Sequence, residues 1–206
     1  MIALQAIEFG AVVAFAIYGI LIASRKQMDF VGLFAVASAV AFGGGTIRDL
    51  CLDRTPLFWI ENSYYTIVVF GLALIGALAP QLMLRLEKYL ALPDALGLGL
   101  FTVVDMGYAL ELGTPLFVSA LIGVMTGAFG GVIADVICNE LPSIFRPAPL
   151  YASCSFAGAW VYIAGVEWGW EPSLTLALSL GTVVFFRLAS IKWNWRLPSV
   201  NHPGND

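Results

Sequence analysis

Seven apolar segments follow one another along this 206-residue chain, and each is close to the roughly 20 residues that a helix needs to cross a bilayer. They cover residues 4–23, 29–51, 62–84, 94–111, 115–138, 149–167 and 172–190. Only 12% of the residues are charged, whereas soluble domains carry about 25%. The sequence lacks the alternating ten-residue runs that are typical of membrane β-barrels. The chain is therefore predicted to be an all-α integral membrane protein with seven transmembrane helices.

The basic residues are distributed unevenly between the two sides that seven spans define. With the N-terminus outside, the outer side holds only Arg48 and Arg54, and the other eight Lys and Arg residues are inside. These eight are Arg25, Lys26, Arg85, Lys88, Arg146, Arg187, Lys192 and Arg196. Since cytoplasmic loops carry the excess of basic residues, we predict an external N-terminus and a cytoplasmic, flexible tail over residues 191–206. Residues 1–23 lack a basic leading region, so they are predicted to be a retained helix, not a signal peptide.

The second segment contains an unusual run of three glycines, Gly43 to Gly45, followed by Arg48 and Asp49. Each interior glycine costs a helix about 1 kcal/mol relative to alanine, so a simple membrane anchor would not be expected to carry three. Irregular backbone within a membrane is tolerated only where protein or a water-filled cavity covers it. The pattern predicts a break in this helix at a functional position.

A second copy of this motif lies 86 residues further along the chain. Matching pairs at this offset are Gly44 and Gly130, Gly45 and Gly131, Ile47 and Ile133, Asp49 and Asp135, Pro56 and Pro142, Glu8 and Asp94, and Phe15 and Phe101. Three helices fit into the offset, and because three is odd the second copy enters the membrane from the opposite side. We predict two inverted three-helix repeats, 1–86 and 87–171, and a seventh helix, 172–190, in a single transmembrane domain of residues 1–190. Inverted repeats place their functional site near the midplane, at the repeat interface.

Small residues recur at every fourth position in the fifth segment, at Ser119, Gly123, Gly127 and Gly131. One interpretation is close helix packing, since small faces let backbones approach. The other is that the breaks free carbonyl oxygens, which can replace the hydration shell of a cation. The predicted pore or kink residues are Gly43, Gly44, Gly45, Gly127, Gly130 and Gly131, with a monovalent cation at the carbonyls near Gly44 and Gly130.

Four charged residues are candidates for the pore or its mouths. Asp105 is predicted near the midplane, where a carboxylate costs several kcal/mol unless it is hydrated, paired or protonated, so it is either a fixed pore charge or a neutral hydrogen-bonding acid. Asp49 and Asp135 directly follow the two glycine motifs, and each is either a helix-end partner or a mouth that attracts cations. Arg48 is expected to pair with Asp49 or another carboxylate.

Catalysis and nucleic-acid binding find no support in the sequence. Its one histidine is His202, in the tail, and it contains neither a Gly-x-Ser-x-Gly elbow nor a zinc motif. The chain is predicted not to be an enzyme and to need no cofactor, and its ten basic residues are too few for a nucleic-acid surface. Cys51, Cys138 and Cys154 have no metal-ligand spacing and are expected to behave as small apolar residues, not as a disulfide.

These residues together resemble the bacterial relatives of the trimeric intracellular cation channels, and the overlapping group of small membrane proteins described as candidate glycine transporters. The resemblance covers nearly the whole chain and rests on the motifs Phe42–Asp49, Arg54–Pro56 with Phe58–Trp59, Gly130–Asp135 and Asp94–Leu98. It implies two inverted three-helix repeats plus one helix, a homotrimer with a pore in each subunit, permeation by potassium and less selectively sodium, and lipids at the subunit interfaces. It also implies the bacterial inner membrane as location and a kink at the two glycine pairs.

Two positions depart from the family pattern. Glu8 stands where an aspartate is usual, and Asp105 stands where a glycine is more usual and where the first copy has Gly19. An extra carboxylate favours cations. Two functions stay open: a passive cation channel, favoured by the short loops and the lack of a cluster that would hold a zwitterion, and a secondary transporter of a small amino acid such as glycine. A structural trimer-forming scaffold is a third, more distant alternative.

Overall fold

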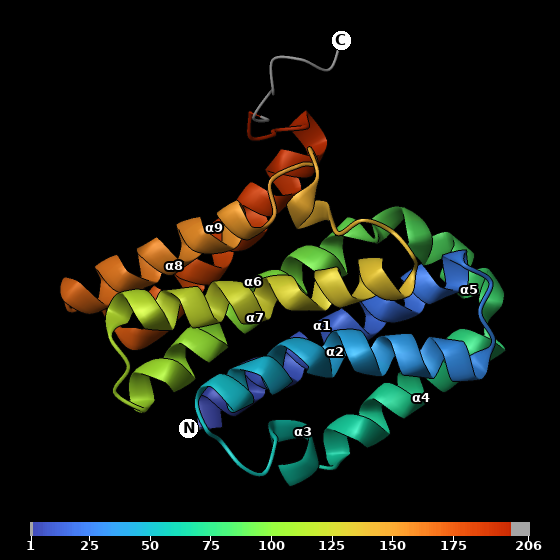
Figure 1. Ribbon diagram of the computed structural model, residues 1–206, viewed down its shortest axis with the longest axis horizontal. Helices are drawn as coiled ribbons and strands as arrows, with labels where there is room; N and C mark the ends of the chain where they lie inside the picture. Colours follow the sequence, from blue (N-terminus) through green and yellow to red (C-terminus); the bar gives the residue numbers. More distant parts are fainter. Residues whose placement is uncertain (1, 199–206) are drawn as a thin grey trace, which may run out of the picture.

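The computed structural model describes residues 2–198, and within that range the protein is helical, with no β-strand. The helices are α1 (Ile2–Arg25), α2 (Phe30–Cys51), α3 (Phe58–Glu61), α4 (Tyr64–Leu78), α5 (Pro80–Leu86), α6 (Ala91–Glu111), α7 (Leu116–Ile137), α8 (Ala152–Glu167) and α9 (Pro172–Trp193), with short 3-10 turns at Glu87–Tyr89 and Ser143–Phe145. Figure 1 shows the long helices side by side in a bundle. The all-helical membrane fold is as predicted, whereas His202 and the tail from residue 199 lie outside the described range.

The third predicted helix, 62–84, is wrong as a single element. α4 ends at Leu78, and α5 begins at Pro80 after a bend of 99° between the two. A proline disfavours the helical backbone conformation in the residue before it, and Ala79 has φ −125° and ψ 61°.

The seventh helix also extends three residues beyond its predicted end, to Trp193, so residues 191–193 belong to α9 and not to the tail.

Four helices of the described chain are long and apolar enough to cross a membrane by themselves: α1 from Leu4, α2, α7 and α9. The bent pair α4–α5 would be a fifth span if its two parts are counted together. α8 has only 16 residues, and α6 carries Asp94, Asp105 and Glu111. The length and apolar character of the helices therefore support a multi-pass membrane protein.

The core is built around α1, which packs against α2, α4 and α6, while α2 and α7 pack against each other. At its centre lie the fully buried Phe15 of α1 and Phe101 of α6, whose ring centroids are 5.4 Å apart. α8 and α9 form a pair beside α6 and α7 (Figure 1). α9 is the least buried of the four spanning-length helices, so it exposes most of its apolar surface on the outside of the bundle.

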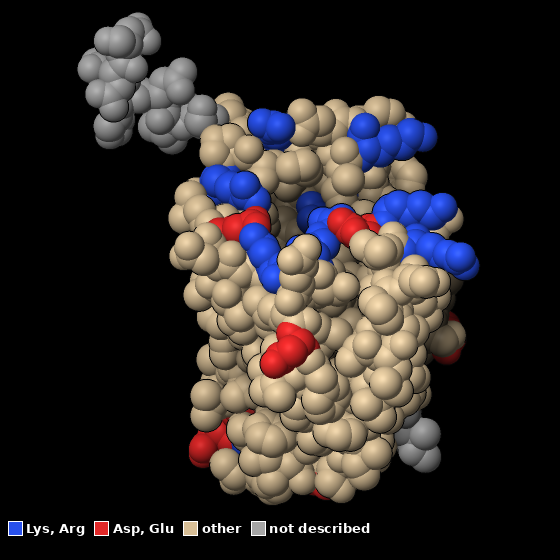
Figure 2. Space-filling view, turned by 90° about the vertical axis from the view of Figure 1, so that its right-hand side faces the viewer, with Lys and Arg blue, Asp and Glu red and all other residues tan. Residues whose placement is uncertain are grey.

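One end of the bundle, which we call the α5 end, carries several ion pairs. Arg25 lies 2.7 Å from Glu87, and Lys26 lies 2.7 Å from Glu140. Figure 2 looks onto this end and shows many Lys and Arg side chains around a hollow. The hydrogen bond between Lys26 and Glu140 raises the pKa of the ammonium group and lowers the pKa of the carboxyl group. Both side chains are exposed, so this pair adds little to stability.

Candidate functional site

The two glycine motifs bring α2 and α7 into direct backbone contact. A Cβ atom on Gly44 would lie 2.3 Å from the carbonyl oxygen of Thr126, and one on Gly130 would lie 3.0 Å from the carbonyl oxygen of Val40. Thr126 follows Val40 by the same 86 residues that separate Gly130 from Gly44. Gly44 and Gly130 therefore make equivalent contacts in the two copies of the repeat, because Thr126 is the counterpart of Val40.

The predicted break is absent from both helices. α2 is helical through Gly43–Gly45 and α7 through Gly130–Gly131, so no break releases carbonyl oxygens at these positions. The glycines are used for close approach instead, because a helix without Cβ atoms on one face lets a second backbone come near. A cation at the carbonyls near Gly44 and Gly130 stays a prediction, and it would need these helices to open.

The other candidate glycines also lie against neighbouring groups. A Cβ on Gly45 would lie 2.5 Å from the ring of Phe58, and one on Gly131 would lie 2.6 Å from the hydroxyl of Tyr151. At Gly127 the nearest atom would be the carbonyl oxygen of Leu98, at 2.8 Å. A Cβ on Gly43 would meet the side chain of Ile133 at 2.1 Å. All six positions are therefore filled by contacts in this conformation.

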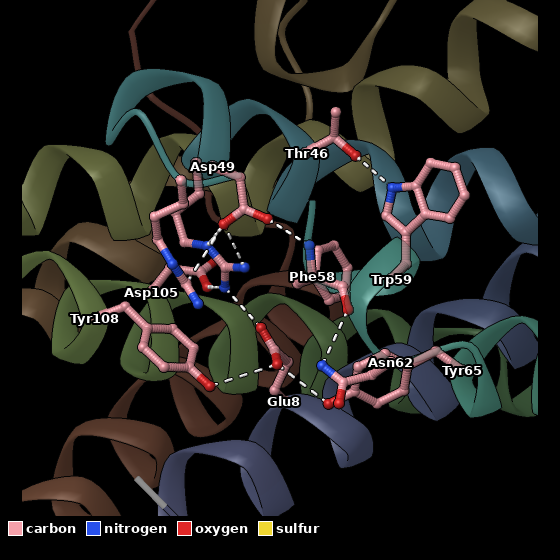
Figure 3. Close-up of polar contacts among 11 residues, drawn as sticks. Glu8, Thr46, Asp49, Phe58, Trp59, Asn62, Tyr65, Asp105 and Tyr108 are labelled. Atoms are coloured by element: carbon pink, nitrogen blue, oxygen red, sulfur yellow. Dashed lines mark hydrogen bonds and ion pairs between the residues drawn. The ribbon is translucent and has the colours of Figure 1, made fainter. Parts of the chain in front are cut away.

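The most unusual feature of the molecule is a buried arginine surrounded by three carboxylates, at the end of the bundle where α3 lies. We call these residues, Glu8, Arg48, Asp49 and Asp105, the Arg48 cluster (Figure 3). Arg48 Nη1 donates to Glu8 Oε1 at 2.8 Å and to Asp105 Oδ1, and Arg48 Nε donates to Asp49 Oδ1 at 2.9 Å. All four side chains are at most 3% exposed. α1, α2 and α6 thus meet at one guanidinium group.

Most of the remaining carboxylate oxygens in the Arg48 cluster also have partners. Glu8 Oε2 accepts hydrogen bonds from Tyr65 at 3.1 Å and Tyr108 at 3.4 Å, and Asp49 Oδ2 accepts from the Phe58 N–H at 2.8 Å. Figure 3 shows the two tyrosine hydroxyls pointing toward Glu8 from opposite sides. The exception is Asp105 Oδ2, which is buried and has no hydrogen-bond partner among the described residues.

The formal charges of the Arg48 cluster do not balance. Its three carboxylates face Arg48 and the partly exposed Arg54, which lies 3.4 Å from Asp49. Three negative charges against two positive charges leave one negative charge in excess. A buried, uncompensated charge is costly, so this cluster favours an additional cation or a proton.

Only part of this cluster could be anticipated from the sequence. The pairing of Arg48 with Asp49 is observed, but Asp105, for which no cation is available on its own helix, is paired with Arg48 from α2. Glu8, Tyr65 and Tyr108 are not among the predicted site residues. The available signal was the match between Glu8 and Asp94 at the repeat offset, since an acidic residue retained in two apolar segments needs a partner.

A second charge cluster lies toward the α5 end, and it consists of Asp94, Tyr151 and Arg187; we call it the Asp94 cluster. Arg187 donates through Nε at 2.9 Å and Nη2 at 2.8 Å to Asp94 Oδ2. Tyr151 donates to Asp94 Oδ1 at 3.0 Å. Asp94 and Tyr151 are the repeat counterparts of Glu8 and Tyr65, which form the same kind of hydrogen bond.

Asp135 has the contact expected of a helix-end partner. Its Oδ2 accepts a hydrogen bond from the Ser143 N–H at 2.8 Å, just as Asp49 Oδ2 accepts from the Phe58 N–H. Both aspartates therefore tie the end of their helix to the segment that follows it. The alternative role of Asp49 and Asp135, as mouths that attract cations, stays a prediction.

One hollow adjoins the Asp94 cluster, and another adjoins the first glycine motif. One of about 380 Å³ is lined by Asp94 and Arg187 together with Tyr18, Arg25, Glu87 and Lys88. The other, of about 580 Å³, is mostly apolar and lies beside α2, with Phe42, Gly43 and Trp59 among its lining residues. Within residues 2–198, no group of three or more His, Cys, Asp and Glu side chains is arranged to hold a metal ion, and the three cysteines are free.

Comparison with known proteins gives consistent matches. The family model described as "Glycine transporter" matches residues 5–80 and 91–167. A UPF0126 membrane protein of Vibrio cholerae is 35% identical over 196 residues, which cover 93% of this chain and 80% of that protein. The UPF0126 inner membrane protein YadS of Escherichia coli K12 is 34% identical over 188 residues, 90% of each chain. The crystal structure of a TRIC trimeric intracellular cation channel orthologue from Rhodobacter sphaeroides has a TM-score of 0.88 and 31% identity, and the match covers 95% of this chain and 100% of that one.

Proposed function

Because this chain belongs to the family of the glycine-transporter model and the UPF0126 membrane proteins, and shares its fold with a cation channel, we propose that it is itself a cation channel. In this proposal it conducts potassium, and sodium less selectively, through a pore in each subunit of a homotrimer. Lipids occupy the subunit interfaces. The protein is not an enzyme and uses no cofactor.

The observation that carries this proposal is the set of repeat-related contacts across the bundle. Gly44 and Gly130 exchange contacts with Thr126 and Val40, and Phe15 lies beside its own counterpart, Phe101. Such reciprocity is what a two-fold axis between the repeats produces, and with an odd number of helices in each repeat it supports two inverted three-helix repeats plus a seventh helix. Transporters and channels built this way keep their site at the repeat interface, which here is the crossing of α2 and α7.

The Arg48 cluster supports cation permeation in particular. It carries one excess negative charge at one end of the bundle, whereas Arg187 neutralises the carboxylate of the Asp94 cluster at the other end. Fixed carboxylates near the ends of a narrow path raise the local concentration of cations. We assign the six candidate glycines to the lining of the pore, and Arg48, Asp49, Asp105 and Asp135 to its charged ends.

A second candidate function is secondary transport of glycine, which the description of the family model favours. A zwitterion needs an anionic and a cationic group at one exposed or occluded site. In the described part of the chain, Arg48 and Arg187 are each already engaged by carboxylates, so neither is available for a substrate carboxylate in this conformation. The channel therefore fits the geometry better.

Proteoliposomes distinguish the two functions. Protein reconstituted in vesicles loaded with potassium should dissipate a potassium gradient when a protonophore supplies the return current, and it should not accumulate labelled glycine. The Gly44→Leu variant serves as a control for leak, because a large side chain at the α2–α7 contact is expected to close or unfold the seam. Uphill glycine uptake without potassium flux would replace the channel with the transporter.

The membrane orientation follows from the same proposal. We place the N-terminus and the Arg48 cluster outside, and the α5 end with its many basic residues in the cytoplasm of a bacterium, at the inner membrane. In a background without native cysteines, Gln27→Cys should react with an impermeant maleimide only from the cytoplasmic side and Leu112→Cys only from outside. Labelling of both from one side would rule out the inverted repeat.

Replacing Asp105 by asparagine should change conduction with little effect on folding. The substitution removes the excess negative charge, since Glu8 and Asp49 then balance Arg48 and Arg54. We expect a drop of roughly twofold or more in cation conductance or cation-over-anion selectivity, because one fixed charge in a low-dielectric path attracts counter-ions strongly. Reversal potentials and thermal melting are measured on the same preparation. Unchanged conductance and selectivity in folded Asp105→Asn protein would remove Asp105 from the pore.

A further inference from the structure

The Arg48 cluster and the Asp94 cluster differ in which part of the chain supplies their arginine. Arg48 lies on α2, within the same three-helix unit as Glu8. Its counterpart 86 residues further along is Ala134, which is fully buried and carries no charge. The arginine that binds Asp94 comes instead from α9, which lies outside both copies of the repeat.

We propose that α9 completes the second repeat. Arg187 is the counter-ion of Asp94, in place of the arginine that α7 lacks at Ala134, and it sets the net charge at the α5 end of the proposed pore. This inference rests on the inverted repeat and the channel proposed above. It assigns a function to α9, which is otherwise only a helix added to the two repeats.

The geometry around Arg187 is that of a specific ion-pair site. Two of its nitrogens donate to one oxygen of Asp94, and its Nη1 donates to the Leu150 carbonyl oxygen at 2.9 Å. Its guanidinium group also lies 4.4 Å from the centre of the Tyr151 ring. The side chains of Arg187 and Asp94 are 11% and 3% exposed. These charge-assisted contacts fix the guanidinium group of Arg187 in one orientation at a largely buried site.

The position of the Asp94 cluster links this pair to ion entry. Asp94 and Arg187 both line the hollow of about 380 Å³ at the α5 end, together with Arg25 and Lys88. Figure 2 shows this hollow among the basic side chains of that face. While Arg187 is present, it neutralises Asp94. Without it, the Asp94 carboxylate would be unpaired beside the hollow, and its field would draw cations into the proposed pore at this end.

The first test transplants the arginine. Arg187→Leu should lower the Tm by roughly 10 °C, because it leaves a buried carboxylate without its cation. Adding Ala134→Arg in that background should restore at least half of the loss, whereas the matched Ala134→Met should restore none. Equal effects of Arg and Met at position 134 on folded protein would overturn the proposal. This measurement needs no conduction, so it decides the role of α9 even if the channel function is wrong.

The second test is electrical and applies where the transplant does not fold. Arg187→Gln should increase cation entry from the α5 end by roughly twofold over entry from the other end, seen as rectification in oriented bilayers. The double variant Asp94→Asn with Arg187→Gln should return rectification to that of the wild type. A purely structural role for Arg187 predicts unchanged rectification in both variants, and that result would overturn the proposal.

Discussion

Replacing Arg48 by methionine is expected to abolish most of the folded protein. Arg48 is the shared partner of Glu8, Asp49 and Asp105, so the substitution leaves three buried carboxylates around an apolar side chain. Removing one partner of a buried ion pair costs about 3–5 kcal/mol, and here three acids lose the same partner. Since whole proteins are stable by only about 5–15 kcal/mol, we expect aggregation or a Tm too low to measure.

Size-exclusion profiles in detergent and thermal melting measure this effect. Arg54→Gln is the matched control, because Arg54 contacts the same Asp49 but is 28% exposed, so it should lose only a few degrees. Combining Arg48→Met with Asp105→Asn and Glu8→Gln should recover part of the folded protein, since two of the three orphaned charges are then removed. A monodisperse Arg48→Met protein that melts like the wild type would contradict the assigned role of the Arg48 cluster.

The second large effect is expected at the contact between α2 and α7. In Gly44→Ala, the new Cβ would lie 2.3 Å from the Thr126 carbonyl oxygen, and a backbone atom cannot move aside as a flexible side chain would. The two helices must separate, which costs more than the roughly 1 kcal/mol that alanine gains in helix propensity. We expect a net loss of about 2 kcal/mol or more, together with reduced potassium flux. Gly130→Ala should behave similarly, because it meets Val40 and Phe15.

Two glycines outside the contact provide controls for helix propensity. At Gly71 in α4 and Gly181 in α9, no heavy atom lies within 4 Å of the place that a Cβ would take, so alanine there should be neutral or slightly stabilising. Melting and flux are compared across the four alanine variants. Equal stability of Gly44→Ala and Gly71→Ala would show that the glycine motif is not a packing seam.

Much of the helical architecture could be predicted from the sequence because membrane spans have a strong local signal. Arg25 and Lys26 end the first apolar segment, and α1 ends at Arg25. Pro115 is the first residue of the fifth predicted segment, and α7 begins directly after it. The bend between α4 and α5 was missed although Pro80 lies in the predicted helix, since the apolar character of the segment continues through the proline.

The charge clusters were only partly predictable, because their members are far apart in the chain. Arg48 and Asp49 are neighbours, so their pairing could be inferred locally. Asp105 and Glu8 lie 57 and 40 residues from Arg48, and only the packing of α1 and α6 against α2 brings them together. Arg187 lies 93 residues from Asp94, outside both repeats, so comparison of the repeats could not identify it.

The glycine motif illustrates a limit of propensity arguments. Gly43–Gly45 should weaken a helix, and the sequence therefore predicted a break. In the structure, the contact of Gly44 with Thr126 and of Gly130 with Val40 compensates for this intrinsic cost, and both helices stay continuous. Close packing of small residues requires a partner helix. Whether a partner helix lies there depends on how the whole bundle folds, and the glycine motif alone does not show it.

Whether the protein contains a cation-conducting path is decided by single-channel recording of purified protein in a planar bilayer, with unequal potassium chloride on the two sides. We expect discrete unitary current steps, carrying about a million ions per second or more, that reverse near the potassium equilibrium potential and become smaller in Asp105→Asn. Absence of unitary steps from correctly folded protein, together with concentrative glycine uptake by the same preparation in liposomes, would show that the protein is a carrier and not a channel.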